Sequence, residues 1–316
     1  MRVRASVLIF TTSLLLTRLV HSQHESRHKR MVSGTDVEPW EVPYQASVRL
    51  IEADRHVGSG AILNVRHVIS QASFIYKLMR QFPQQQLSTL ARIRVGQLEL
   101  KSQPNDQFRP IRSCTFHPEF DFELAQNDVA LLRTASEIEF NLLVQPIGLR
   151  RGPIPDGSIV RYTDWGADKL TATQEDFKEK LQQMNAQAIS NDQCKQLLGA
   201  WDLQDFLYES RVCIYTNGIG SVCTGNVGGP LVMLEDGKPQ LVGVMTYVYR
   251  ACNASVPGGF ERLWNHYDWV TKTSTIDYKY GNFAQKCRVV RNVASQLQQT
   301  SRKVAERLRM AAKDSN

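Results

Sequence analysis

The chain has 316 residues, 42% of them hydrophobic, and its length allows one large domain or two ordinary ones. Its net charge of +7 is unevenly spread: residues 1–30 carry +5, residues 273–316 carry +6 and the body between them carries −4. The basic character therefore lies at the two ends of the chain, and we expect no nucleic-acid partner.

Residues 1–22 have the pattern of a secretory signal peptide. Arg2 and Arg4 form a charged start, Val7–Leu16 an apolar core, and Val20–Ser22 a small-residue cleavage context. The apolar core is too short to span a bilayer, and no later segment reaches the roughly 20 apolar residues of a membrane helix. We therefore expect a secreted, extracellular protein without a transmembrane segment.

Short apolar runs separated by turn residues predict an all-β fold for the body of the chain. The clearest runs are Ala61–Ile69, Ala91–Leu98, Val129–Leu132, Leu231–Leu234 and Leu241–Tyr247.

A series of motifs between residues 31 and 272 resembles the trypsin/chymotrypsin-like (S1) serine protease family, in family order and spacing. The most specific is C-T-G-N-V-G-G-P at Cys223–Pro230, which resembles C-x-G-D-S-G-G-P. V-I-S-Q-A-S-F at Val68–Phe74 resembles V-L-T-A-A-H-C, and N-D-V-A-L-L-R at Asn127–Arg133 resembles N-D-I-A-L-L. Further matches to family motifs are Met31–Gly34, Val42–Val48, Gly58–Leu63, Asp164–Gly166, Pro257–Phe260 and Trp264–Val270.

The resemblance implies two six-stranded antiparallel β-barrels followed by a C-terminal helix. It also implies a division of the chain after the signal peptide. Residues 23–30 are expected to be a short propeptide-like segment, residues 31–272 a trypsin-like pseudoprotease domain and residues 273–316 a helical extension.

Proteases of this family use a serine nucleophile, a histidine base and an aspartate that orients the base. The resemblance keeps the aspartate as Asp128 but places Ser73 at the histidine position and Val227 at the serine position. His67 and Thr224 are the nearest substitutes; His67 fits a strand residue better, and Thr224 has no base beside it. We therefore expect a pseudoenzyme with no catalytic residue.

Two further departures concern zymogen activation. The resemblance places a cleavage site between Arg30 and Met31, and makes Gly225 and Asn226 the oxyanion-hole-like positions. In the family an aspartate at the position of Asn226 pairs with the new α-amino group, and a neutral amide lacks that charge. We expect the activation switch to be weakened or lost.

The residues that correspond to the specificity pocket are Ser221, Thr246, Val248 and Gly258. Ser221 stands where a trypsin-type aspartate is expected, and Val248 replaces a glycine that keeps the pocket mouth open. Two alternatives remain: an extended peptide binds there by strand addition, or the cleft serves packing only.

The six cysteines suit an oxidising compartment but allow 15 pairings. The resemblance implies Cys194–Cys213 and Cys223–Cys252. We hypothesise that Cys114 and Cys287 also bridge; the alternatives are a bridge between chains or a free thiol. Asn253-Ala254-Ser255 is an N-glycosylation sequon, so a glycan is expected on Asn253.

In the extension, apolar residues recur at helical spacing and basic residues cover the rest, which predicts an amphipathic helix. The apolar positions are Val290, Val293, Leu297, Val304, Leu308 and Ala311. Three alternatives remain open: a solvated or partly disordered tail, docking onto a partner or an acidic surface such as glycosaminoglycan, or membrane binding.

The leading hypothesis is a secreted, non-catalytic serine protease homologue that acts as a protein-binding cofactor, adaptor or carrier. It resembles insect homologues that serve in immune cascades or seminal fluid, so its expected partner is a protease, an inhibitor or a peptide ligand. The eight residues between signal and activation-like site contain no cysteine, which argues against a clip domain and favours reproductive secretions. The alternatives are an immune protease-cascade regulator without a clip domain and a weak residual endopeptidase. No cofactor or metal is expected.

Overall fold

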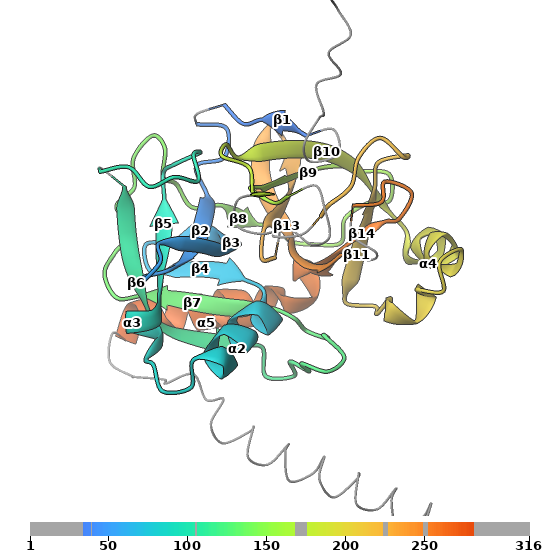
Figure 1. Ribbon diagram of the computed structural model, residues 1–316. Helices are drawn as coiled ribbons and strands as arrows, with labels where there is room; N and C mark the ends of the chain where they lie inside the picture. Colours follow the sequence, from blue (N-terminus) through green and yellow to red (C-terminus); the bar gives the residue numbers. More distant parts are fainter. Residues whose placement is uncertain are drawn as a thin grey trace, which may run out of the picture.

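The computed structural model describes residues 34–38, 40–104, 106–167, 176–223, 227–248 and 252–280. Within them the chain forms two β-barrels that lie side by side (Figure 1). The predicted all-β fold with two six-stranded barrels is confirmed.

The first barrel closes in the strand order β2-β3-β4-β7-β6-β5, with every pair antiparallel. Its strands are β2 (Gln45–Leu50), β3 (Arg55–Asn64), β4 (His67–Ser70), β5 (Ala91–Val95), β6 (Gln107–Phe116) and β7 (Ala130–Thr134). All six residues of β2 are buried: Ala46, Val48 and Leu50 pack in the core of this barrel, and Gln45 bonds Thr163 of the second barrel.

The second barrel closes in the order β9-β10-β11-β14-β13-β12, since β12 and β10 both pair with β9. Its strands are β9 (Ile159–Asp164), β10 (Gln182–Ile189), β11 (Arg211–Tyr215), β12 (Pro230–Glu235), β13 (Lys238–Val248) and β14 (Gly258–Arg262). Two short strands extend the sheet: β1 (Thr35–Asp36) pairs antiparallel with β10, and β8 (Gly148–Leu149) pairs parallel with β13.

Few helices accompany the strands in the described part of the chain. They are α2 (Ala72–Gln81), α3 (Leu87–Leu90), α4 (Asn191–Gly199), η2 (Gln204–Phe206), η3 (Leu263–His266) and α5 (Tyr267–Tyr280). The predicted C-terminal helix is confirmed as α5, which continues beyond residue 272 to Tyr280 and lies against the first barrel (Figure 1). The predicted helix of the basic extension lies outside the described residues. None of the described helices is both long and apolar enough to cross a bilayer.

The apolar run predicted over Ala61–Ile69 is divided in the structure between β3 and β4. The side-chain oxygen of Asn64 accepts hydrogen bonds from the backbone N–H groups of Arg66 and His67, both at 2.9 Å, and so closes a tight turn. A run of apolar residues does not reveal such a turn, because the turn depends on one polar side chain bonding locally.

A third apolar cluster joins the two barrels, in addition to the core of each. It brings Tyr44 and Leu131 of the first barrel against Val232 and Val244 of the second, with Val270 of α5 beside them. Residues at this interface are held by both barrels, which makes it a rigid setting for any site built there.

Two disulfides stabilise the second barrel. Cys194 of α4 is bonded to Cys213 of β11, and Cys223 is bonded to Cys252. Loops of this size contribute about 3 kcal/mol each in the chain-entropy model. Cys114 is also disulfide-bonded, whereas Cys287, its expected partner, lies outside the described residues.

Candidate functional site

Three polar side chains from distant parts of the chain meet where the two barrels touch. Gln71 precedes α2, Asp128 precedes β7, and Thr246 lies on β13 of the second barrel. All three are buried, with exposed fractions of 5%, 0% and 6%. The sequence separates them by up to 175 residues, so only the packing of the barrels brings them together.

The carboxylate of Asp128 is bonded through both of its oxygens. Oδ1 accepts from the backbone N–H of Ser73 at 2.6 Å, and Oδ2 accepts from Nε2 of Gln71 at 2.8 Å. Ser73 lies in the first turn of α2, so the carboxylate also caps the amino end of that helix, where negative charge is stabilised. Burial raises the pKa of Asp128 to about 6, and the hydrogen bonds from Ser73 and Gln71 oppose that rise.

The Gln71 amide nitrogen makes a second hydrogen bond, to the carbonyl oxygen of Thr246 at 2.8 Å. Both of its protons are therefore donated, one to each barrel. A side-chain amide nitrogen donates only and has no lone pair that takes up a proton near neutral pH. Gln71 thus bonds the Asp128 carboxylate without being a base.

Sequence reasoning missed Gln71 as a site residue, although the motif comparison contained a signal. V-I-S-Q-A-S-F has glutamine where V-L-T-A-A-H-C has a small alanine, two residues before Ser73. A long polar side chain at a position that suits alanine must find hydrogen-bonding partners when it is buried.

Ser73 stands where the family has its histidine base. Its hydroxyl is buried and has no hydrogen-bond partner in the described structure. Its contact with Asp128 runs through the backbone. Neither His67 nor any other described histidine replaces it beside Asp128: His67 is buried in β4, with Nδ1 3.0 Å from Oδ1 of Asn64.

Val227 is half-buried, and its backbone is wedged between the barrels. Its carbonyl oxygen accepts from the N–H of Ser59 on β3 at 2.8 Å, and the N–H of Gly228 donates to the carbonyl of Met245 on β13 at 2.9 Å. Gly228 has φ of 81°, and a Cβ there would lie 2.3 Å from both Ser59 O and Ser70 Oγ. Only glycine fits at position 228, and the two backbone hydrogen bonds hold the turn in place. The side chain of Val227 carries no heteroatom that could act as a nucleophile.

The four predicted pocket residues come together around β13 and β14. Val248 and Gly258 are direct partners in this strand pair, and a Cβ on Gly258 would lie 2.7 Å from Val222. Ser221 is next to Val222, and its hydroxyl and that of Thr246 are buried without hydrogen-bond partners in the described structure. The predicted specificity positions therefore hold two unpaired hydroxyls and a tightly packed glycine.

The remaining predicted site residues are four that the structure does not describe and Asn253. Gly225, Asn226, Arg30 and Met31 lie outside the described residues. Asn253 is half-buried and its Oδ1 accepts from the N–H of Ser255 at 2.9 Å, which orders the sequon as a local turn. Within the described ranges no group of three or more His, Cys, Asp or Glu side chains is placed to hold a metal ion.

Comparison with known proteins agrees with this architecture. The family model described as Trypsin matches residues 31–270. The chain is 26% identical over 245 residues to Trypsin-1 of Astacus astacus, covering 76% of this chain and 98% of that protein. It is 25% identical over 266 residues to Trypsin iota of Drosophila melanogaster, covering 84% of this chain and 97% of the relative. Serine protease 1 of Homo sapiens is 24% identical over 246 residues, with 77% and 89% of the two chains covered.

Proposed function

Because the chain belongs to the trypsin family, we propose that it is a secreted, non-catalytic serine protease homologue that acts by binding another protein. The proposal is supported above all by the hydrogen bond from the Gln71 amide to Asp128. The amide stands where a base would contact the carboxylate, and its nitrogen does not accept a proton. With valine at residue 227, the site has neither a base beside the carboxylate nor a nucleophile at the turn.

The expected loss of turnover is large enough that we expect no biologically useful hydrolysis. Removal of the nucleophile or the base from a protease of this type lowers turnover by about 10⁶. A site that lacks both, and in which a glutamine side chain fills the space next to Asp128, has no route to an acyl-enzyme.

Secretion belongs to the same proposal, together with cleavage between Arg30 and Met31 and a glycan on Asn253. Its support is the cysteine chemistry: all five described cysteines are in disulfides, which form and persist in oxidising compartments. We place the protein among adaptors, cofactors or carriers of extracellular fluids, with reproductive secretions as the setting that the resemblance favours.

The test of the non-catalytic part is labelling of the purified, cleaved protein with a fluorophosphonate, together with turnover of peptide substrates that carry Arg, Phe or Ala before the scissile bond. We expect neither labelling nor turnover above background. Ser73→Ala is the control variant, and it should leave the background unchanged. Turnover that Ser73→Ala or Thr224→Ala abolishes would instead establish a weak residual endopeptidase.

The test of the binding part is affinity recovery of the tagged mature protein from its native secretion. A truncation after Cys287 serves as the matched variant, because it removes most of the basic extension and keeps all six cysteines. We expect a specific protease, inhibitor or peptide to be recovered by both forms, which would place the contact on the barrels. Recovery by the full chain alone would place it on the extension and favour the carrier hypothesis.

A further inference from the structure

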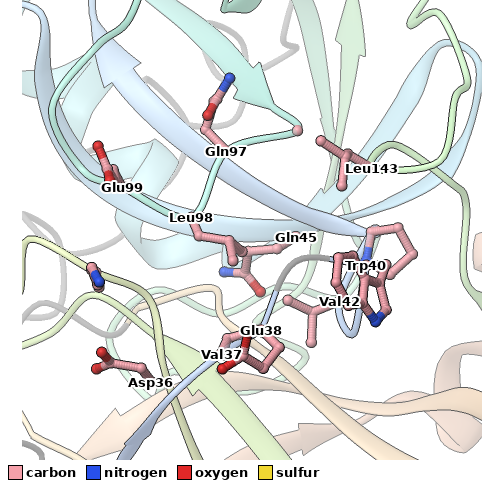
Figure 2. Close-up of a pocket in the computed structure, with 13 residues that line it drawn as sticks. Asp36, Val37, Glu38, Trp40, Val42, Gln45, Gln97, Leu98, Glu99 and Leu143 are labelled. Carbon is pink, nitrogen blue, oxygen red and sulfur yellow. The ribbon is translucent and has the colours of Figure 1, made fainter.

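A cavity lies apart from the Asp128 site and shares no residue with it. Its volume is 320 Å³, and it is lined by the segment that leads from β1 into β2, by the turn after β5, and by Leu143 and Lys180 (Figure 2). Residues of both barrels therefore form its walls, and nothing in the proposed site chemistry uses it.

One end of this cavity is apolar and exposed. Trp40 is 70% exposed and Leu143 is 42% exposed, and Figure 2 shows both on the same side of the cavity. A tryptophan left in water is unusual, because its large apolar surface gains from burial. Trp40 also has φ of 67°, a conformation that costs a bulky residue energy, so the surrounding chain holds it in this position.

The other end of the cavity is acidic. Asp36 and Glu99 are exposed at its rim there, Glu38 is exposed nearer the middle of the cavity, and Lys180 is the one basic residue among those that line it (Figure 2). In the described structure none of the three carboxylates takes part in an ion pair: Asp36 accepts from the Gln182 amide and Glu99 from the Gln103 amide at 3.4 Å. Figure 2 shows Glu99 and Asp36 across the cavity from Trp40. The rim is therefore negative and available to a cation.

A buried, unpaired donor lies at the floor. Gln45 is 4% exposed and lines the cavity; its Oε1 accepts from the hydroxyl of Thr163 at 2.9 Å, whereas its Nε2 has no partner in the described structure. An unsatisfied buried amide costs about 1–3 kcal/mol. The terminal torsion of glutamine is soft, so a small rotation presents this N–H to a carbonyl oxygen placed at the floor.

We propose that this cavity is a docking site for an extended segment of a partner polypeptide that carries a lysine or arginine next to an apolar residue. The basic side chain lies on the side of Asp36 and Glu99, its apolar neighbour packs on Trp40 and Leu143, and a backbone carbonyl accepts from Gln45. Arginine suits the site best, because its planar guanidinium forms paired hydrogen bonds with carboxylates. The inference rests on the proposed binding function and gives that function a surface and a partner chemistry.

The experiment selects random linear peptides displayed on phage against the purified full chain and measures the enriched peptides by fluorescence polarisation. We expect the enriched sequences to contain Lys or Arg beside an aliphatic or aromatic residue. Trp40→Ala should weaken binding at least tenfold and Glu99→Gln about threefold, and 0.5 M salt should weaken it further, since the ion pairs are exposed. Both substitutions are at exposed positions, and circular dichroism checks that each variant is folded.

The matched controls are Trp264→Ala, a 40% exposed tryptophan on η3, and Glu209→Gln, an exposed carboxylate before β11. Both should bind within twofold of the wild type. Enriched peptides without basic residues, or equal binding by Trp40→Ala, Glu99→Gln and the wild type, would overturn the docking site.

Failure of the docking site and failure of the proposed function have different signatures. If Trp40→Ala still recovers the natural partner in full while hydrolysis stays absent, the function stands and this surface is wrong. If the chain hydrolyses peptides, the function is wrong whatever binds at Trp40.

Discussion

At the scale of single residues, the Gln71 side chain is long enough to bond both Asp128 and the opposite barrel. The amide bonds the carboxylate and at the same time the carbonyl of Thr246 on the opposite barrel. Asp128 in turn holds the N–H of Ser73 at the start of α2. These three hydrogen bonds predict measurable effects on stability.

Gln71→Ala should destabilise the protein by about 2–3 kcal/mol, because it leaves the buried Asp128 Oδ2 and Thr246 carbonyl without donors. Urea unfolding of the variant and the wild type measures the difference. Gln85→Ala, at an exposed turn position, is the control and should change stability by less than about 0.5 kcal/mol. Equal losses in the two variants would show that the Gln71 bonds contribute nothing specific.

Asp164 predicts a pH dependence. Burial raises the pKa of this carboxyl from 3.8 to about 7, against the hydrogen bond that it accepts from the Trp165 N–H. Between these two values the folded protein holds a proton that the unfolded chain has lost, so stability contributed by this group falls as pH rises from about 4 to about 7. The slope approaches about 1.4 kcal/mol per pH unit within that window.

The check compares thermal unfolding of the wild type and Asp164→Asn from pH 4 to pH 8. The wild type should lose stability relative to the variant as pH rises, because asparagine does not titrate. His56 and His117, whose pKa values burial lowers to about 3 and about 4, act in the opposite direction in both proteins and cancel in the comparison. Parallel profiles would refute the shift at Asp164.

At the scale of elements, the loop after β5 is held by a buried arginine. The guanidinium of Arg94, in β5, donates to the carbonyls of Glu99 at 2.7 Å, Leu100 at 3.0 Å and Lys101 at 2.9 Å. It also pairs with Asp106 at 2.5 Å, and both side chains are almost fully buried. This loop carries Glu99 to the rim of the cavity beside Trp40, so the Arg94 side chain positions a residue of the proposed docking site.

Arg94→Gln should destabilise the protein by about 3–5 kcal/mol, because it leaves the Asp106 carboxylate buried and unpaired. Chemical denaturation measures the effect. Arg92→Gln is the matched control, because Arg92 is in the same strand and pairs with Asp54. Both of these side chains are partly exposed, so we expect this substitution to destabilise the protein by at most about 1 kcal/mol. A loss of stability no larger than that of the control would mean that the loop after β5 does not depend on Arg94 for its conformation.

The elements themselves were largely predictable. Val129–Leu132, Leu231–Leu234 and Leu241–Tyr247 each fall within or across the start of an observed strand, because a barrel core needs apolar residues at those positions. The Ala91–Leu98 run ends early at Val95, since Gly96 with φ of 81° turns the chain. Helix α2 was not predicted: its first three residues, Ala72–Phe74, end the V-I-S-Q-A-S-F motif, and its amphipathic pattern continues from there to Gln81.

At the scale of the whole molecule, the first barrel, the second barrel and α5 share one apolar interface. His117 of the first barrel packs edge-on against His266, with ring centroids 4.7 Å apart, and against Trp269, at 5.0 Å. The C-terminal helix thus fastens the end of the domain to the barrel at its beginning. A covalent link between Cys114 of β6 and Cys287 would act in the same direction.

Peptide mapping without reduction should recover a fragment in which Cys114 and Cys287 are joined, alongside the Cys194–Cys213 and Cys223–Cys252 fragments. Cys114 is already disulfide-bonded in the structure, and a chain closure of more than 100 residues would stabilise the fold by about 4–5 kcal/mol in the entropy model. A free thiol at Cys287, or its recovery linked to another chain, would contradict the hypothesis.

The sequence by itself determined the family and the two-barrel fold, because the order and spacing of the motifs from Met31 to Val270 encode where strands and turns must fall. It also named Val227 and Ser73 as the unusual positions. Only the tertiary structure decided that Gln71 bonds Asp128, a residue 57 positions away, and that Trp40, Gln45 and Glu99 line one cavity. Hydrogen bonds and cavities depend on which surfaces the packed barrels bring together, and local patterns of residue type do not record that.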